Sequence, residues 1–449
     1  MDHVEELAKA CSVVTGDEIG IDTLDRAAVI LADCLGAIVG GAAEPDIQAL
    51  RQRPFVAPEG PSALIGTSGT TTPVAAAFIN GTAGTVLEMD EGNQFARGHP
   101  GMHVVPAVLA MAAAGGRFSG RDILVAITVG YEAAARVGIA TKLNPALHPH
   151  GTWGTVGAAV AVLRLMGVDS HAMREGINMA ASLGLANSRQ TMLEGGTVRN
   201  AYTGLSGQMG IHVADMLRAG FRADNNGLQH VYSHVAGTSF NPADLTEDLG
   251  QRWEVKRNYF KMHSCCRYNH AALDALDMIL ASETVNPAAI NLIEVDTYAL
   301  AVELDNPTPP NVLGAKFSVP FAVATRLVTG SSGVESFSAQ KVKDPTILDL
   351  SQKVVLREDP AMSAKLPDQR PARVVLHLAD GRVLRGVADT NRGDWTDPYP
   401  LDELCEKYLS LTCRLWDERA ARNIWDQTLS LVDGSVEAFL AAILSAPRD

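Results

Sequence analysis

Five helix-length stretches rich in alanine, glycine and valine dominate the first half of this 449-residue chain. Apolar residues recur in them at helical spacing, and several stretches are apolar on nearly every face, as in helices buried inside a larger helical body. The first ends on Gly40-Gly41, a helix stop signal. The stretches span residues 21–41, 73–89, 120–140, 152–169 and 201–220. They predict tightly packed helices, because small side chains let helices approach closely.

The pattern changes after about residue 285, where β-branched residues and alternation predict strands. The predicted strand segments are residues 291–304, 353–359 and 372–389. The last of these contains Asp380-Gly381, a strong hairpin signal, so it predicts two strands joined by a tight turn. Between them, residues 316–330 predict a helix that begins at Ser318-Val319-Pro320.

Helical periodicity returns near the end of the chain. Residues 393–400 predict a linker, and the segment from residue 401 onward predicts helices again. We therefore expect a mainly α protein. Its large all-helical domain is formed by residues 1–268 and 396–449, and a smaller α+β domain by residues 269–395.

Charge and cysteine usage narrow the class of protein. The formal net charge is −14, and an acidic surface repels phosphate backbones, so we expect no nucleic-acid partner. Six cysteines without a CxxC pair, and an acidic opening segment without a secretory signal, predict a reduced, cytoplasmic setting. We identify no apolar run of the ~20 residues that a membrane span needs, and we expect no membrane partner.

Familiar cofactor and metal motifs do not fit the chain. Three glycines at the start of the 152–169 stretch lack the spacing and the preceding strand of a dinucleotide site, so we interpret them as positions of close helix packing. His99 and His103 lie four residues apart, as in some helical metal sites, but Pro100 and Gly101 interrupt that helix. We therefore expect neither a metal nor an organic cofactor.

Four polar segments stand out between the apolar helices. They are residues 88–103, 144–154, 192–204 and 259–270. Each lies in a loop or at the start of a helix, so the polar ends of packed helices can meet in one cleft. Histidine transfers protons near neutral pH, and lysine and arginine bind carboxylates. The pattern predicts cofactor-free proton transfer on a small polycarboxylate.

Simpler interpretations stand beside this one. An isolated histidine more often caps a helix or packs in a core than it catalyses a reaction. Arg97 and Glu91 can form a plain surface ion pair, and adjacent Cys265-Cys266 is interpreted as packed rather than nucleophilic.

At these polar segments the sequence resembles the MmgE/PrpD family. The first block, residues 88–114 (EMDEGNQFARGHPGMHVVPAVLAMAAA), is similar to the family's acidic residues followed by a loop, His-Pro and an alanine-rich helix. Three further blocks match in order: HPHGTWGTVGAAVAV, KMHSCCRYNHAALDAL and AKFSVPFAVA. The likeness covers nearly the whole chain. It implies a large helical domain, a smaller α+β lid, an active site between them and a homodimer.

The resemblance, together with the polar pattern, assigns roles to thirteen residues. Catalytic roles are expected for His99, His148, Glu88, Asp90 and Lys261, and substrate contacts for Asn93, Arg97, His103, His150, Arg199, Cys266, Arg267 and Tyr268. Histidines would move protons, cations would hold carboxylates, and the acids would orient the histidines or relay protons.

Several positions depart from the family pattern. Glu88 and Glu91 stand where aspartates are common, Arg199 stands where a lysine is common, and Cys266 stands near a histidine of the decarboxylase-like members. Further departures are Gly92 and His150 in place of threonines and Phe321 in place of a tyrosine.

The resemblance implies a cofactor-independent lyase that acts on a small di- or tricarboxylate by proton abstraction and elimination, of dehydratase or decarboxylase type. The Arg97-Gly98-His99-Pro100 string and its longer loop resemble the epimerase branch instead. This leaves an epimerase of an amino- or imino-dicarboxylate such as iminodisuccinate as an alternative, with Asn93 or Gln94 near the substrate nitrogen. A non-catalytic carboxylate-binding relative is a third hypothesis.

Overall fold

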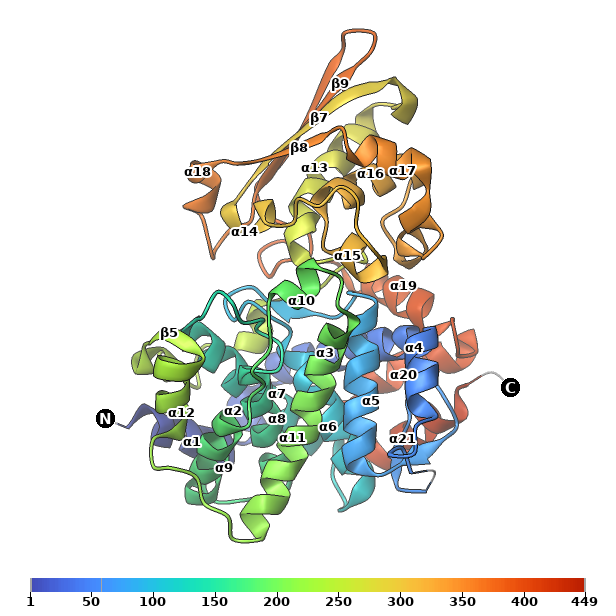
Figure 1. Cartoon of the computed structure of the whole chain (residues 1–449). Coiled ribbons are helices and arrows are strands. Elements are labelled where there is room, and N and C mark those ends of the chain that lie inside the picture. Colours follow the sequence, from blue (N-terminus) through green and yellow to red (C-terminus); the bar gives the residue numbers. More distant parts are fainter. Residues whose placement is uncertain (1, 58, 448–449) are drawn as a thin grey trace.

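The chain folds into two parts, a helical one and a smaller one that contains the sheet (Figure 1). Each part has its own large hydrophobic core. The computed structural model describes residues 2–57 and 59–447. The first core is built from side chains between Val4 and Phe260 and again between Tyr399 and Ala446; we call this part the body. The second is built from side chains between Cys265 and Ala388, which we call the module, together with Met192. The C-terminal helices therefore return to the body.

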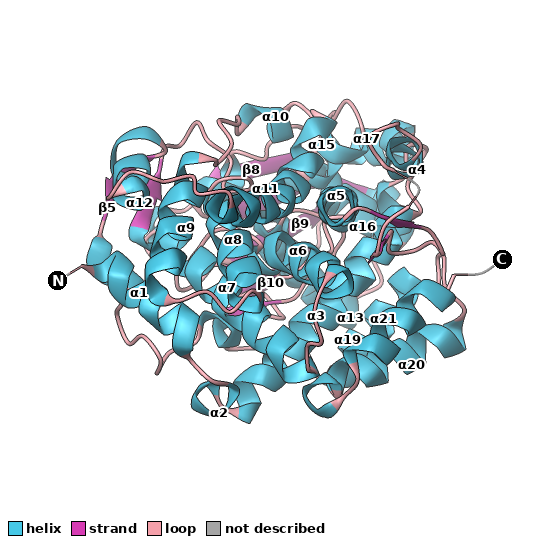
Figure 2. Cartoon of the chain, turned by 90° about the horizontal axis from the view of Figure 1, so that it is seen from below, coloured by secondary structure: helices cyan, strands magenta, loops and turns pink. Residues whose placement is uncertain are grey.

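The body is helical, as the apolar periodicity predicts. Its helices are α1 (His3–Val13), α2 (Gly16–Ile19), α3 (Ile21–Ala42), α4 (Pro45–Arg51), α5 (Pro73–Val86), α6 (Pro100–Ala114), α7 (Gly120–Ala140), α8 (Trp153–Leu165), α9 (Ser170–Ser182), α10 (Gln190–Leu193), α11 (Ala201–Arg218), α12 (Gly227–His230), α19 (Leu401–Thr412), α20 (Glu418–Leu429) and α21 (Val436–Ser445). All five predicted helical stretches are confirmed. Figure 2 shows α6 and α8 near the middle of the body, surrounded by other helices, and almost every side chain of both is buried.

Small residues bring α6, α7 and α8 into close contact, which confirms the interpretation of the glycine-rich stretch. A Cβ atom at Gly154 would lie 2.0 Å from the Cδ2 atom of His103, and one at Gly157 would lie 2.6 Å from the carbonyl oxygen of Gly130. No side chain fits at such distances. The glycine at 154 therefore decides where the His103 ring packs.

Three short strand pairs join loops of the body. They are β1 (Ser62–Ala63) with β2 (Thr70–Thr71), β3 (Gly92–Asn93) with β6 (Asn258–Tyr259), and β4 (Thr141–Leu143) with β5 (Gly237–Phe240). The β3–β6 pair brings the loop after α5 beside the segment that leads into the module.

The module is an α+β unit with one four-stranded sheet in the order β10-β9-β7-β8. Its strands are β7 (Ile290–Thr297), β8 (Val354–Glu358), β9 (Ala372–Leu378) and β10 (Val383–Ala388), and its helices are α13 (Arg267–Ser282), α14 (Ala299–Val302), α15 (Val312–Lys316), α16 (Val319–Thr329), α17 (Pro345–Ser351) and α18 (Pro360–Ser363). The hairpin at Asp380-Gly381 is confirmed, with Gly381 at φ +88°. So is the helix at 316–330, which Ser318 caps by accepting a hydrogen bond from the Phe321 amide.

One predicted strand is too long. The segment 291–304 is extended only to Thr297, and Ala299–Val302 forms α14. The amide of Ala299 donates to the hydroxyl of Ser363, which turns the chain away from the sheet, and alanine and leucine favour the helical turn that follows.

The statement that no apolar run is long enough for a membrane span is wrong for one helix. By length and composition α7 qualifies, and the bent pair α3–α4 would qualify if counted as one span. However, 94% of the most apolar window of α7 is buried inside the protein. Its apolar character is thus explained by packing against neighbouring helices.

Candidate active site

A cavity lies where the loops of the body meet the module. It is lined by Glu88, Arg97, His99, His148, Pro149, His150, Arg189, Met192, Arg199, Tyr259, Cys266, Arg267, Tyr268, Phe317 and Arg370. Each of the four polar segments contributes to this wall, so the predicted convergence of distant loops is observed. The volume is about 60 Å³, well below the ~300 Å³ or more of typical ligand pockets. Substrate binding therefore requires side chains to shift or the two parts to separate.

The loop between α5 and α6 is shaped by its own polar residues. The side-chain oxygen of Asn93 accepts hydrogen bonds from the amides of Phe95 and Ala96, and its amide group donates to Glu254. Asn93 is fully buried and does not line the cavity. The structure thus places it in the support of the loop, away from the expected substrate contact.

A buried charge network forms the floor of the site. The Nζ atom of Lys261 lies 3.1 Å from Asp90 and 3.4 Å from Glu88, and Arg199 forms an ion pair with Glu88. Two carboxylates and two cations balance in charge. Burial opposes ionisation of Asp90, but the coulombic effects of His99, Lys261 and Arg199 outweigh it and lower the pKa of Asp90 to about 2. Both acids therefore remain ionised and held in place.

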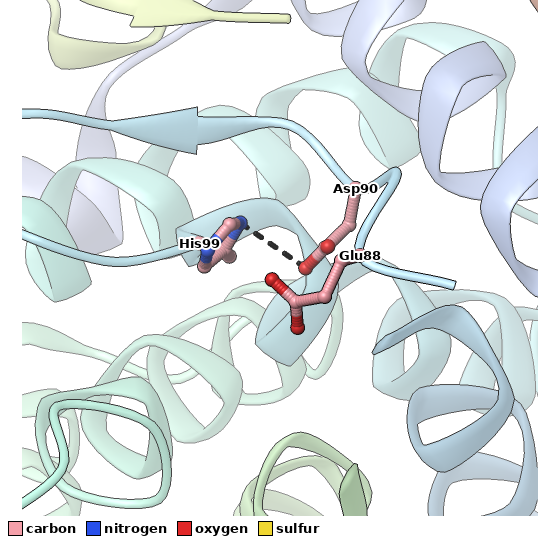
Figure 3. Close-up of side chains that lie close together, drawn as sticks. All are labelled: Glu88, Asp90 and His99. Atoms are coloured by element: carbon pink, nitrogen blue, oxygen red, sulfur yellow. Dashed lines mark ion pairs between the residues drawn. The ribbon is translucent and has the colours of Figure 1, made fainter. Parts of the chain in front are cut away.

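His99 is the N-cap residue of α6, and its ring faces this network (Figure 3). The carboxylates of Glu88 and Asp90 point toward the ring, and Nδ1 lies 3.1 Å from Oδ2 of Asp90. Nδ1 also meets the carbonyl oxygen of Glu91. A carbonyl can only accept, so Nδ1 carries the proton and donates it there, and Oδ2 of Asp90 is left without a hydrogen bond.

The other ring nitrogen of His99 is therefore a free base. Within the described part of the chain, Nε2 makes no hydrogen bond, and the residue lines the cavity. Burial lowers the pKa of His99 to about 4, although Asp90 acts in the opposite direction. At neutral pH the imidazole is uncharged, with the lone pair of Nε2 available to take a proton.

His148 is held in the opposite tautomer. The amide of His150 donates to Nδ1 of His148 at 3.1 Å, so in the neutral ring the proton sits on Nε2. The N–H group of Arg199 Nε also points at this Nε2, at 3.4 Å. A neutral ring accepts at one nitrogen only, and the shorter bond from the His150 amide takes the lone pair of Nδ1. Two N–H donors at this distance cannot satisfy one another. They present a paired donor site for an oxyanion or a carboxylate.

Asn187 fixes the loop that carries His148. Its side chain accepts from the amide of His148 at 2.8 Å and donates to the carbonyls of His148 and His150. No sequence motif pointed to Asn187. An asparagine in a polar loop is too common to single out without its partners.

Two further histidines lie near the cavity, and only one of them, His150, lines it. Nδ1 of His103 lies 2.8 Å from the carbonyl of His99, and its Nε2 accepts from the amide of Gly151. His103 is buried behind the cavity and does not line it, so the structure places it in the scaffold. The ring of His150 packs edge-on against those of His99 and His148, at centroid distances of 4.7 and 4.5 Å.

Three other residues that were expected to contact the substrate also line the cavity: Arg267, Tyr268 and Cys266. Arg267 forms an ion pair with Asp394, and Tyr268 and Cys266 border the cavity beside it. Burial raises the pKa of the Cys266 thiol to about 11, so it is a neutral thiol and a poor nucleophile. This agrees with the interpretation of the cysteine pair as packed. Cys11, Cys34, Cys265, Cys266 and Cys405 form no disulfide bond.

The simple ion pair between Arg97 and Glu91 does not exist. Arg97 is exposed at the rim of the cavity, whereas Glu91 is buried and accepts from the amide of Gly101 and the hydroxyl of Tyr131. Burial raises the pKa of Glu91 to about 8.

Sequence reasoning missed several residues of the cavity wall, of which Arg370 is the most informative. It belongs to the module and precedes β9, where a charged residue beside Pro371 and a buried strand was the only available signal. Arg189, Phe317 and Tyr259 were missed as well, because nothing local distinguishes them.

Glu88, Asp90 and His99 also have the composition of a metal site. Their ligand atoms lie within 4.8 Å of one another. However, the same two carboxylates already pair with Lys261 and Arg199, whose charges a divalent cation would face at close range. The arrangement suits proton transfer better than metal coordination.

Comparison with known proteins places both parts of the chain in one family. A family model described as the MmgE/PrpD N-terminal domain matches residues 5–241, and one described as the MmgE/PrpD C-terminal domain matches residues 263–431.

Relatives extend over most of the chain. The cis-aconitate decarboxylase of Aspergillus terreus is 24% identical over 95% of this chain and 92% of its own length. The cis-aconitate decarboxylase-like protein oryM of Aspergillus oryzae is 24% identical over 98% and 97%, and the human cis-aconitate decarboxylase is 25% identical over 77% and 74%. With both domain models matched in order, this chain belongs to the MmgE/PrpD family.

Proposed function

We propose that this protein is a cofactor-independent lyase of dehydratase or decarboxylase type that acts on a small di- or tricarboxylate. One observation supports the proposal most strongly: the free Nε2 of His99 and the paired donors of His148 and Arg199 border the same buried cavity. A base and an oxyanion site in one buried pocket are what proton abstraction next to a carboxylate requires. The names of the relatives support the same reaction class.

In the proposed reaction Nε2 of His99 takes a proton from the carbon next to a carboxylate. The electron pair of the broken C–H bond moves onto that carboxylate, which the N–H groups of His148 and Arg199 stabilise. In an elimination the pair then forms a C=C bond while hydroxide leaves the neighbouring carbon. The proton that His99 has taken passes to this hydroxide, so that water is lost and the imidazole is neutral again. Asp90, beside Nδ1, stabilises the imidazolium that forms.

The uncharged state of His99 favours proton abstraction as the first step. In a decarboxylation the C–C bond breaks first and the carbon then needs a proton, so the histidine would have to begin protonated. Burial disfavours that form. Among lyase reactions, the neutral state of His99 therefore suits elimination best.

A second candidate is epimerisation of an amino- or imino-dicarboxylate. It begins with the same abstraction but needs a proton donor on the other side of the carbon. The neutral thiol of Cys266, which lines the cavity where decarboxylase-like relatives were expected to carry a histidine, favours this alternative. The contacts of Asn93 do not favour it, because its amide is used inside the loop.

Deuterium exchange tests the proposal. Protein dialysed against a chelator is incubated in D₂O with a panel of C4–C7 polycarboxylates, and products are identified by NMR and mass spectrometry. We expect deuterium at a carbon next to a carboxylate, together with loss of water or carbon dioxide. Inversion without loss would support the epimerase instead. No incorporation from any acid in the panel, with binding retained, would indicate a non-catalytic relative.

His99→Gln should abolish the exchange while leaving binding in place. His171→Gln is a matched control, because His171 is exposed on α9 and does not line the cavity. Exchange that survives in the His99 variant would contradict the assignment of the base.

A further inference from the structure

The five arginines of the cavity wall fall into two groups. Arg199, Arg267 and Arg189 form ion pairs with Glu88, Asp394 and Glu303 respectively. Arg97 and Arg370 have no carboxylate partner among residues 2–57 and 59–447. Within the described residues, neither of these two guanidinium groups is therefore neutralised by a direct ion pair.

The two unpaired groups differ in burial. Arg97 is exposed at the rim, where water solvates its charge. Arg370 is only 3% exposed, and its Nε is buried without a hydrogen-bond partner. The Nε atoms of Arg189 and Arg267 are unpartnered as well, but those two side chains have a carboxylate beside them. A buried, unpaired cation is unfavourable unless an anion arrives to neutralise it. Arg370 is thus the residue whose environment calls for a ligand.

The position of Arg370 is well defined. Its Nη2 donates to the carbonyl of Gln94 at 2.9 Å, and its guanidinium lies over the ring of Tyr268 at 5.4 Å. In return the side chain of Gln94 donates to the carbonyl of Asp368 at 3.0 Å. These reciprocal bonds join the loop of the catalytic base to the module. They place a module cation against the same cavity as His99.

We infer that Arg370 binds a second carboxylate of the substrate, remote from the carbon at which His99 acts, and that it selects dicarboxylates over monocarboxylates. The inference rests on the proposed function, in which the N–H groups of His148 and Arg199 hold the carboxylate next to the reacting carbon. Arg97, which is exposed and lines the cavity, adds a second positive charge there. A substrate with one carboxylate would leave Arg370 buried and unpaired.

Selectivity is measured with two substrates that share the same reacting end. One is a dicarboxylate, and in the other the second, remote carboxylate is replaced by an amide. The ratio of their kcat/KM values is the readout, with binding of succinate and butyrate by calorimetry as a non-reacting probe pair. We expect Arg370→Gln to reduce the preference for the dicarboxylate at least tenfold, as expected for loss of a charge-assisted bond. The deuterium exchange of the monoamide should remain close to that of the unmodified protein.

Arg370→Lys keeps the charge but loses the planar fork, and it should reduce the preference to an intermediate extent. Arg373→Gln is the matched control, because Arg373 lies three residues further on β9 and pairs with Asp296 outside the cavity. It should leave the ratio unchanged.

The outcomes separate the two proposals. An unchanged ratio in both Arg370 variants, with exchange retained, overturns the role of Arg370 and leaves the proposed function intact. If the unmodified protein exchanges no acid at all, the proposed function fails, and the succinate-to-butyrate binding ratio still decides whether Arg370 selects dianions. If the glutamine variant does not fold, the lysine variant decides by the same ratio.

Discussion

The Nδ1 atom of His99 lies 3.1 Å from Oδ2 of Asp90, yet its proton points to the carbonyl of Glu91. The carboxylate therefore sits beside the ring as a charge rather than as a hydrogen-bond acceptor. It stabilises positive charge on His99 only when the ring gains a second proton. In the resting protein burial dominates and the ring stays neutral.

Asp90→Asn should therefore slow the proposed reaction mainly through kcat. Removing the charge beside a catalytic imidazole removes stabilisation of the imidazolium, and we expect a loss of about 10²-fold or more. KM should change much less. Steady-state kinetics on the substrate found by deuterium exchange checks this, and a kcat within threefold of the unmodified protein would contradict the role of Asp90.

The buried histidines should make the fold sensitive to acid. Burial lowers the pKa of both His99 and His103 to about 4, below the usual 6.5, so the unfolded chain binds more protons between those values. The free energy of unfolding should therefore fall as the pH decreases from about 6.5 to 4, by up to about 3 kcal/mol for each ring. Urea titrations at pH 7, 6, 5 and 4 measure the slope.

His103→Gln supplies the control for that titration. The variant should lose stability at pH 7, because the bonds to His99 and Gly151 are weakened, but its stability should depend less on pH. Equal slopes in the two proteins would show that His103 does not carry the effect.

The contribution of Glu91 to stability should have the opposite pH dependence. Its pKa is raised to about 8 by burial, so its contribution to stability is complete below the unfolded value of 4.5 and is lost as the pH rises through 8. Glu91→Gln mimics the protonated acid. It should therefore lose less stability than the unmodified protein between pH 6 and 9, as measured by thermal unfolding, and parallel curves would refute this.

Gly154→Ala tests the packing behind the histidines. The added methyl group would lie 2.0 Å from the ring of His103, so helix or ring must move. Overpacking of this kind costs about 1–3 kcal/mol, and we expect a lower melting temperature together with reduced activity. Gly333→Ala is the control, because its new Cβ would meet only the Ser331 hydroxyl at 3.4 Å. A change of the same size in both variants would contradict the specific contact.

The sequence by itself determined the helices of the body, the hairpin of the module and the family, because hydrophobic periodicity and short motifs are local signals. The strand at 291–304 was overestimated for the same reason: alternation continues past Thr297, whereas a bond to Ser363 turns the chain. Local pattern does not register a partner more than sixty residues away.

Only the tertiary structure decided what each polar side chain does. Asn93 and His103 lie in the same polar segment as His99 and Arg97, so the sequence does not distinguish their roles. Their polar atoms bond to neighbouring backbone groups and so support the site. Arg370 became part of the cavity because the module folds back onto the loop at Gln94. Hydrogen-bond direction and charge pairing depend on which distant segments touch, and that is a property of the packed chain alone.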